Sequence, residues 1–327
     1  MTSSDPPMPG ENHLLKLYAD MLLIRRAEER LSTLFAEGEV PGFIHLSIGQ
    51  EAVPVGVMSA LTAADTIAST HRGHGHAIAK GLPLQGFFAE LLGRDEGLGR
   101  GRGGSMHVAD LSIGMLGANG IVGAGLSIAL GSALAHKGLG RAAVALAFFG
   151  DGALGEGLLH ECLNLASLWR LPLLFVCENN GWSEFLPSAK QITFKLADLA
   201  PAYGIPHIAV DGNDVAAVSA AAADAVMRVR QHEPVVLECI TTRVHGHYEG
   251  DAQKYRDPAE REALAARDPL RITAAQLDGL GCGADRLRDV LADVDRRIEA
   301  AIAAARAGTD PDFAAAKADA YTRPEAS

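Results

Sequence analysis

Two short polar turns in the middle of the chain carry side chains suited to binding a hard cation. The first is Gly150-Asp151-Gly152 and the second is Asn179-Asn180, and each follows an apolar run. Carboxylate and amide oxygens are ligands that Mg²⁺ accepts, together with phosphate and water. Glycines also let the backbone approach an anion, and a following helix points its first N–H groups toward it. Taken alone, however, Gly-Asp-Gly is usually only a turn.

The apolar runs around these turns predict a doubly wound α/β core with a parallel sheet. Strands are expected at 142–149, 171–177, 205–210 and 235–241, and helices at 121–136, 156–169 and 215–230. Crossovers between parallel strands return the chain to the same edge of the sheet, so both turns should open at its carboxyl edge. This placement makes the pair of turns far more specific than either turn alone.

Helical sequence is expected on both sides of this core. The pattern predicts helices over 14–35 and 51–61, Ala-rich helices after Arg271, and loops over 70–80 and 97–104. We expect one domain over 1–327, with a loose segment at 1–12 and a loose tail at 310–327.

Composition narrows the class of protein. The chain has 327 residues, with 29 basic and 40 acidic side chains and a net charge of -11. This balance argues against a nucleic-acid-binding protein, although Gly99-Arg100-Gly101-Arg102-Gly103-Gly104 has the composition of an arginine–glycine segment. The apolar runs are too short to span a bilayer. Four scattered cysteines and the absence of a signal-peptide pattern predict a cytoplasmic location.

The region from Gly150-Asp151-Gly152 through Leu171-Pro172 to Asn179-Asn180 resembles the thiamin-diphosphate motif. Residues 14–258 more broadly resemble alpha subunits of 2-oxo acid and acetoin dehydrogenases. The resemblance implies the thiamin-diphosphate-binding fold, with Mg²⁺ held by Asp151, Asn180 and the backbone oxygen of Trp182. It also implies cofactor contacts from Arg72, Gly120, Val122, Gly150, Asp151, Gly152, Ala153, Asn180, Trp182 and His247.

Histidines make up the remaining candidate site. The resemblance implies that His45 faces substrate, that His247 is the catalytic histidine, and that His245 orders its loop. His71 and His74, in Thr70-His71-Arg72-Gly73-His74-Gly75-His76, are further catalytic candidates, since imidazole exchanges protons near neutral pH. Two other interpretations stay open at this point: His71, His74 and His76 could bind zinc, and the histidines near 247 could be solvated loop residues.

The resemblance implies an oxidoreductase that cleaves acetoin, or a similar acyloin, to an aldehyde and a cofactor-bound acyl carbanion transferred oxidatively to lipoamide. Pyruvate-specific relatives carry a tyrosine where this chain has His71, which favours acetoin. The alternatives are a pyruvate-type 2-oxo acid dehydrogenase, an acyloin-forming enzyme, a non-catalytic subunit and a zinc hydrolase. The expected partners are a beta subunit that completes the site of an α2β2 heterotetramer, and a lipoyl-bearing acyltransferase.

Overall fold

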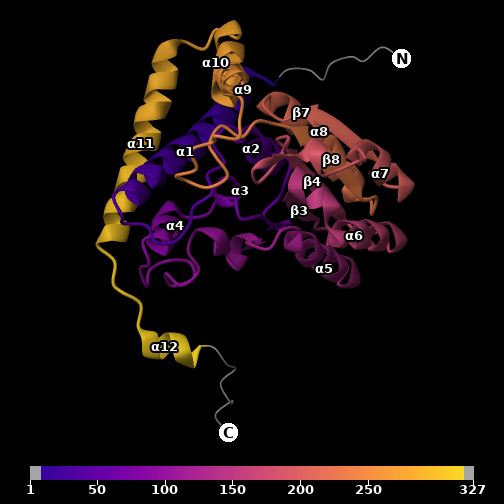
Figure 1. Cartoon of the computed structure of the whole chain (residues 1–327), viewed down its shortest axis with the longest axis horizontal. Helices are drawn as coiled ribbons and strands as arrows, with labels where there is room; N and C mark the ends of the chain where they lie inside the picture. The colour runs from indigo at the N-terminus through magenta and orange to yellow at the C-terminus, as the bar shows by residue number, and fades with distance from the viewer. Residues whose placement is uncertain (1–8, 320–327) are drawn as a thin grey trace.

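The computed structural model describes residues 9–319, and a six-stranded parallel sheet lies at their centre. Its strand order is β2-β1-β3-β4-β8-β7 (Figure 1). The strands are β1 Thr66–Ala68, β2 Met115–Gly117, β3 Ala145–Gly150, β4 Leu173–Asn179, β7 His207–Asp211 and β8 Val235–Ile240, and a separate hairpin joins β5 Trp182–Ser183 to β6 Leu186–Pro187. The predicted doubly wound α/β fold is therefore confirmed.

Helices cover both faces of this sheet because its central strands are apolar on both faces. The helices are α1 Glu11–Ala36, α2 Ala52–Met58, α3 His74–Ala79, α4 Leu84–Leu91, α5 Ala124–Gly138, α6 Gly157–Leu168, α7 Leu196–Ala202, α8 Val215–Val229, α9 Pro258–Leu264, α10 Pro269–Gly279, α11 Ala284–Arg306 and α12 Phe313–Ala318. One apolar cluster joins α5, α6 and α7 to Ala147 and Phe149 of β3. The other joins α1, α2, α3 and α8 to Leu146 and Phe148. Alternate residues of β3 thus fill opposite cores.

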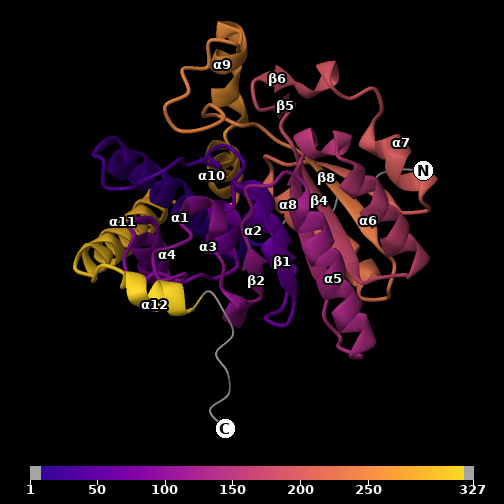
Figure 2. The ribbon, with the colours of Figure 1, turned by 60° about the horizontal axis from the view of Figure 1, so that its bottom comes forward.

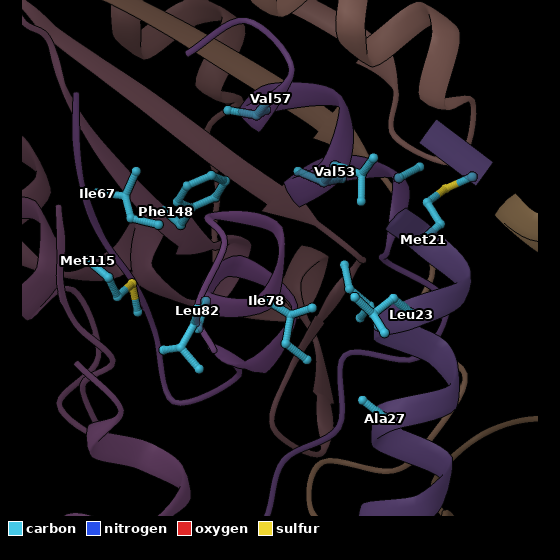
Figure 3. Packing of buried hydrophobic residues seen from close by; sticks show 14 of the residues in the cluster. Met21, Leu23, Ala27, Val53, Val57, Ile67, Ile78, Leu82, Met115 and Phe148 are labelled. Atoms are coloured by element: carbon cyan, nitrogen blue, oxygen red, sulfur yellow. The ribbon is translucent and has the colours of Figure 1, made fainter. Parts of the chain in front are cut away.

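The second cluster anchors the N-terminal helices to the sheet. Figure 3 shows Met21 of α1, Val53 of α2 and Ile78 of α3 in the same buried group as Phe148 of β3. Figure 1 shows α11 lying beside α1, where the salt bridges Arg26–Asp295 (2.7 Å) and Arg30–Glu299 (2.5 Å) join them.

Among the described residues, no helix is both long and apolar enough to cross a membrane.

The strand order creates a crevice at the carboxyl edge of the sheet. The chain passes from β1 outward to β2, its neighbour in Figure 2, and then returns to β3 on the other side of β1. The segments that leave β1 and β3 therefore diverge, and doubly wound folds bind ligands at such a point. This geometry places the segments that begin at Ser69 and at Asp151 on the two sides of one opening.

Several predicted boundaries were wrong, each for an identifiable reason. Strands β1 and β2 were missed because three residues are too few to show a strand pattern. Residues 70–80 were predicted as a loop, but His74–Ala79 forms α3, in which both histidines are buried rather than solvated. At the chain ends, α1 already begins at Glu11 and Phe313–Ala318 is helical, so neither segment is loose throughout. Residues 1–8 and 320–327 of those two segments lie outside the described residues.

The Arg-Gly segment forms a structural loop around Glu90, a buried residue of α4. The backbone N–H groups of Gly99, Gly101, Gly103 and Gly104 donate to the Glu90 carboxylate at 2.7–3.1 Å. The glycines are required because a Cβ at Gly97 or Gly101 would lie within 2.6 Å of backbone atoms. Several backbone dipoles thus converge on one carboxylate, and they fix a loop that leads to Met106 at the crevice.

We predict that Glu90→Gln destabilises the chain by about 1 to 3 kcal/mol, since neutral amide oxygen accepts these N–H groups more weakly than carboxylate. Urea unfolding at pH 7.5 measures the loss. Glu262→Gln, at an exposed position of α9, is the matched control. Equal unfolding midpoints for the two variants would contradict the assigned role of Glu90.

Candidate functional site

A cavity of about 440 Å³ opens at the crevice on the carboxyl edge of the sheet. Its walls come from the segments that follow β1, β3, β4 and β8, from the start of α5, and from the loop before α2. The structure brings together every predicted site residue except His74: His45, His71, Arg72, Gly120, Val122, Gly150, Asp151, Gly152, Ala153, Asn180, Trp182 and His247 line the cavity. These residues are spread over some two hundred positions of sequence, so the fold alone makes them neighbours.

One side of the cavity is built for a cation. The Asp151 side chain is 1% exposed, and within residues 9–319 it has no basic side chain at ion-pair distance. Its carboxylate accepts hydrogen bonds from the Ser188 hydroxyl and from the Asn180 N–H. Burial raises the pKa of Asp151 to about 6, whereas its hydrogen bonds to Ser188 and the backbone act in the opposite direction. A buried carboxylate without a counter-charge is strongly stabilised by a metal ion.

Asn180 is held in position beside this carboxylate. Its side-chain N–H donates to Gln50 Oε1 at 2.9 Å, and its Oδ1 accepts from the backbone N–H of Trp182 at 3.0 Å. Gln50 therefore determines which way the amide points. Gln50 is 1% exposed, and sequence reasoning did not identify it as a site residue. Its position next to Gly49 in a loop far from the polar turns gave no signal of this contact.

Two buried arginines add positive charge to the same cavity. Arg72 and Arg243 both line it and are 6% and 2% exposed, yet neither forms an ion pair with an acidic residue in the described part of the chain. Arg72 donates to the carbonyl oxygens of Leu46 (2.5 Å) and His247 (3.0 Å), which fixes its guanidinium. Burial, followed by repulsion from Arg243, lowers the pKa of Arg72 to about 9. A bound diphosphate would supply the missing negative charge.

The backbone shape supports the same assignment. Gly152 lies so close to Ser183 that a Cβ there would come within 2.8 Å of the Ser183 hydroxyl. Gly123 adopts a left-handed φ of +80° as the N-cap of α5, whose N-terminal end faces the cavity. The first N–H groups of a fifteen-residue helix favour negative charge. The close backbone approach and the helix N-terminus thus lie in the same cavity that the two buried arginines line.

Three imidazoles meet at the mouth of the cavity. The ring centroid of His45 is 4.8 Å from that of His71 and 5.1 Å from that of His247, and the last two are 5.4 Å apart. Burial, followed by the charge of Arg72, lowers the pKa of His45 to about 3, that of His247 to about 4, and that of His71 well below its ordinary value. All three rings are therefore neutral at pH 7.

The loop after β8 holds His247 in this group. Asp251 accepts the His247 N–H at 2.8 Å and the Tyr255 hydroxyl at 2.6 Å. A Cβ at Gly246 would lie 2.5 Å from Asp251, so the turn requires glycine. His245 instead faces Glu249 at 3.4 Å, outside the cavity lining. This position agrees with the predicted loop-ordering role of His245.

His74 does not join the other histidines, so the geometry gives no support to its predicted catalytic role. It is fully buried, and its two ring nitrogens bond Glu28 at 3.0 Å and Ser105 at 2.7 Å. His76 bonds Ser69 and stacks on Phe148. The three histidines of the 71–76 segment thus point to different partners, and among the described residues no group of histidine, cysteine or acidic side chains is arranged to hold a metal ion. The zinc interpretation therefore loses its structural basis.

Arg243 is the most important site residue that sequence reasoning left without a role. Its side chain is almost fully buried and donates to the carbonyl oxygen of Glu184 at 3.0 Å, while its Nε has no hydrogen-bond partner. From sequence alone, an arginine in a polar loop is expected to be exposed to solvent. Only the fold reveals that Arg243 lines the cavity.

We predict that acid weakens folding through His247. Its pKa is about 4 in the folded chain and about 6.5 when unfolded, so the unfolded state binds more protons between these values. The stability is full above pH 6.5 and is lost as the pH falls toward 4. Between pH 7.5 and 5, the wild type should lose on the order of 1 kcal/mol more than His247→Gln in urea unfolding. Equal losses would show that His247 titrates normally.

A known protein family matches the part of the chain that forms the cavity. The family described as the dehydrogenase E1 component matches residues 19–313. This match includes every segment that lines the cavity, from the loop before α2 to the loop after β8.

Individual relatives cover most of the chain. The chain is 50% identical over 264 residues to the alpha subunit of acetoin:2,6-dichlorophenolindophenol oxidoreductase from Bacillus subtilis, which covers 80% of this chain and 79% of the relative. It is 44% identical over 292 residues to the alpha subunit with the same name from Cupriavidus necator, covering 88% and 87%. It is 38% identical over 317 residues to the pyruvate dehydrogenase E1 component subunit alpha of Porphyra purpurea, covering 94% and 92%.

Proposed function

The chain belongs to the dehydrogenase E1 component family, and from this premise we propose that it is the alpha subunit of an enzyme that cleaves acetoin or a similar acyloin. Thiamin diphosphate is the cofactor that membership implies, and when bound it supplies the carbon nucleophile and electron sink. The observation that carries the proposal is the cavity itself. A buried carboxylate and two buried guanidinium groups, none of them in a salt bridge among the described residues, line the same cavity.

Mg²⁺ is the ion we propose for the cation side. Asp151, Asn180 and the backbone oxygen of Trp182 would hold it, with the cofactor diphosphate as a further ligand. Their oxygen chemistry fits a hard divalent ion. Arg72 and Arg243 would neutralise the remaining phosphate charge, and the backbone at Gly120, Val122, Gly150, Gly152 and Ala153 would lie against the cofactor. The charges of the two sides then cancel within one site.

Acetoin is favoured by the imidazole of His71. Cleavage of an acyloin requires a base that takes the hydroxyl proton as the carbon–carbon bond breaks and the aldehyde leaves. His71 lines the cavity beside His45 and His247, and its imidazole would take that proton. Decarboxylation of a 2-oxo acid has no such proton to remove. His247 and His45 would then orient the substrate carbonyl and exchange a proton with the hydroxyl oxygen formed from it.

A 2-oxo acid of the pyruvate type is the second candidate substrate, supported by the similarity to pyruvate dehydrogenase alpha subunits. An acyloin-forming reaction would use the same residues in reverse. A non-catalytic subunit is disfavoured because the arginines, the carboxylate and the three neutral imidazoles all converge on one cavity. A subunit that only kept the fold and carried out no reaction would not need these buried, unpaired charges, because burying them costs free energy.

The proposed assembly is an α2β2 heterotetramer. Activating the thiazolium requires a carboxylate against the aminopyrimidine ring, and we expect a beta subunit to contribute it across the interface. A lipoyl-bearing acyltransferase is the proposed acceptor of the acyl unit. The four cysteines are buried free thiols, which supports a cytoplasmic location as part of this proposal.

Asp151→Asn should weaken binding of thiamin diphosphate with Mg²⁺ by at least about 100-fold in calorimetric titration, because the main anionic ligand is lost. The same variant without cofactor should be as stable as the wild type or on the order of 1 kcal/mol more stable at pH 7.5, since a buried charge has been removed. Undiminished affinity in this variant would overturn the proposed site.

Steady-state assay of the reconstituted α/β pair should show a higher kcat/KM for acetoin than for pyruvate. His71→Asn should lower acetoin turnover by about 100-fold or more, because an amide cannot take the hydroxyl proton, while pyruvate turnover falls much less. Wild-type enzyme that turns over pyruvate faster than acetoin would refute the acyloin assignment and favour the pyruvate-type alternative.

A further inference from the structure

The indole of Trp182 connects the polar turn after β4 to the histidine loop. Its Nε1–H donates to Glu260 Oε1 of α9 at 2.9 Å. The guanidinium of Arg256 lies 5.2 Å from the indole ring centre, and the ring of Tyr255 is 5.3 Å away. Trp182 is thus in contact with three side chains of the segment that follows His247.

A chain of hydrogen bonds connects these side chains to the backbone of His247. Arg256, which is 4% exposed, donates to the carbonyl oxygen of Arg243 at 2.7 Å. Tyr255 donates to Asp251, and Asp251 also accepts the backbone N–H of His247. The loop from Arg243 to Arg256 is therefore closed on itself, and its outer end rests on the indole.

Glu260 is the member of this group farthest from the cavity. Its side chain is 38% exposed and does not line the cavity, so it touches neither the proposed cofactor nor the substrate. It approaches the Arg256 Nε only to 3.7 Å, so its closest contact is with the indole. A residue placed in this way can act on the reaction only through the side chains it contacts, the hydrogen-bonded indole of Trp182 and, more weakly, the guanidinium of Arg256.

We propose that Glu260 is a positioning residue which, by holding the Trp182 indole, couples the cofactor-binding turn to the order of the His247 loop. Anything that fixes the backbone at Trp182 then also fixes the indole, the side chains of Tyr255 and Arg256, and the loop that presents His247. The cofactor part of this inference rests on the proposed function, whereas the link between Glu260 and the loop does not.

The test compares Glu260→Ala with Glu260→Gln in the purified α/β complex. The amide oxygen of glutamine can still accept the indole N–H, so only alanine removes the contact. Hydrogen–deuterium exchange of peptides covering 243–256, and tryptic cleavage after the exposed Lys254, are measured without cofactor. Glu260→Ala should raise both rates by about fivefold to tenfold, the effect of one net hydrogen bond. Glu260→Gln and the same-helix control Glu262→Ala should match the wild type.

A second measurement asks whether the effect passes through the indole. Trp182→Phe keeps an aromatic ring but has no N–H donor, so adding Glu260→Ala to it should change neither rate further. With thiamin diphosphate and Mg²⁺ present, the wild-type loop should be protected, and Glu260→Ala should need several-fold more cofactor for the same protection.

Wild-type rates in Glu260→Ala, or an equal effect of that change in the Trp182→Phe background, would overturn the inference. A wild-type complex that binds no thiamin diphosphate would instead refute the proposed function, and the cofactor-free comparison would still decide the role of Glu260.

Discussion

The structure depends on the burial of one carboxylate, Asp151, at the carboxyl end of β3. A carboxylate removed from water needs either a proton or a cation, and the described chain offers it hydroxyl and backbone donors but no basic side chain at ion-pair distance. The neighbouring arginines are held away by bonds to backbone oxygens. The unliganded chain thus keeps opposite charges apart inside one cavity, and a metal with a diphosphate is the natural way to join them.

The same separation explains the state of the histidines. Arg72 lies close enough to His45, His71 and His247 that its charge adds to their burial in keeping them neutral. A diphosphate bound at Arg72 would offset that charge, so the basicity of the imidazoles rises when the site is loaded. Proton transfer by these imidazoles would thereby be linked electrostatically to the binding of a diphosphate at Arg72.

Much of this arrangement could be predicted from sequence because the central strands are long, apolar and separated by single helices. Their positions fix the two polar turns at one edge, and Asp151 and Asn180 meet as expected. The errors have a common origin. Strand β1, the helix that begins at His74, and the contact of Gln50 with Asn180 all depend on tertiary partners that leave no periodic pattern. His74 was misassigned because a histidine beside catalytic candidates looks the same in sequence whether it faces a cavity or bonds a buried Glu28.

The pairing of α1 with α11 affects the order in which the protein can be made. Arg26 and Arg30 near the start of the chain bond Asp295 and Glu299 near its end. On the ribosome, the side of α1 that packs against α11 therefore stays uncovered until nearly the whole polypeptide has emerged. Nascent chains should consequently depend on chaperones until α11 has left the exit tunnel. A chain that ended before α11 would leave the apolar side of α1 exposed and prone to aggregation.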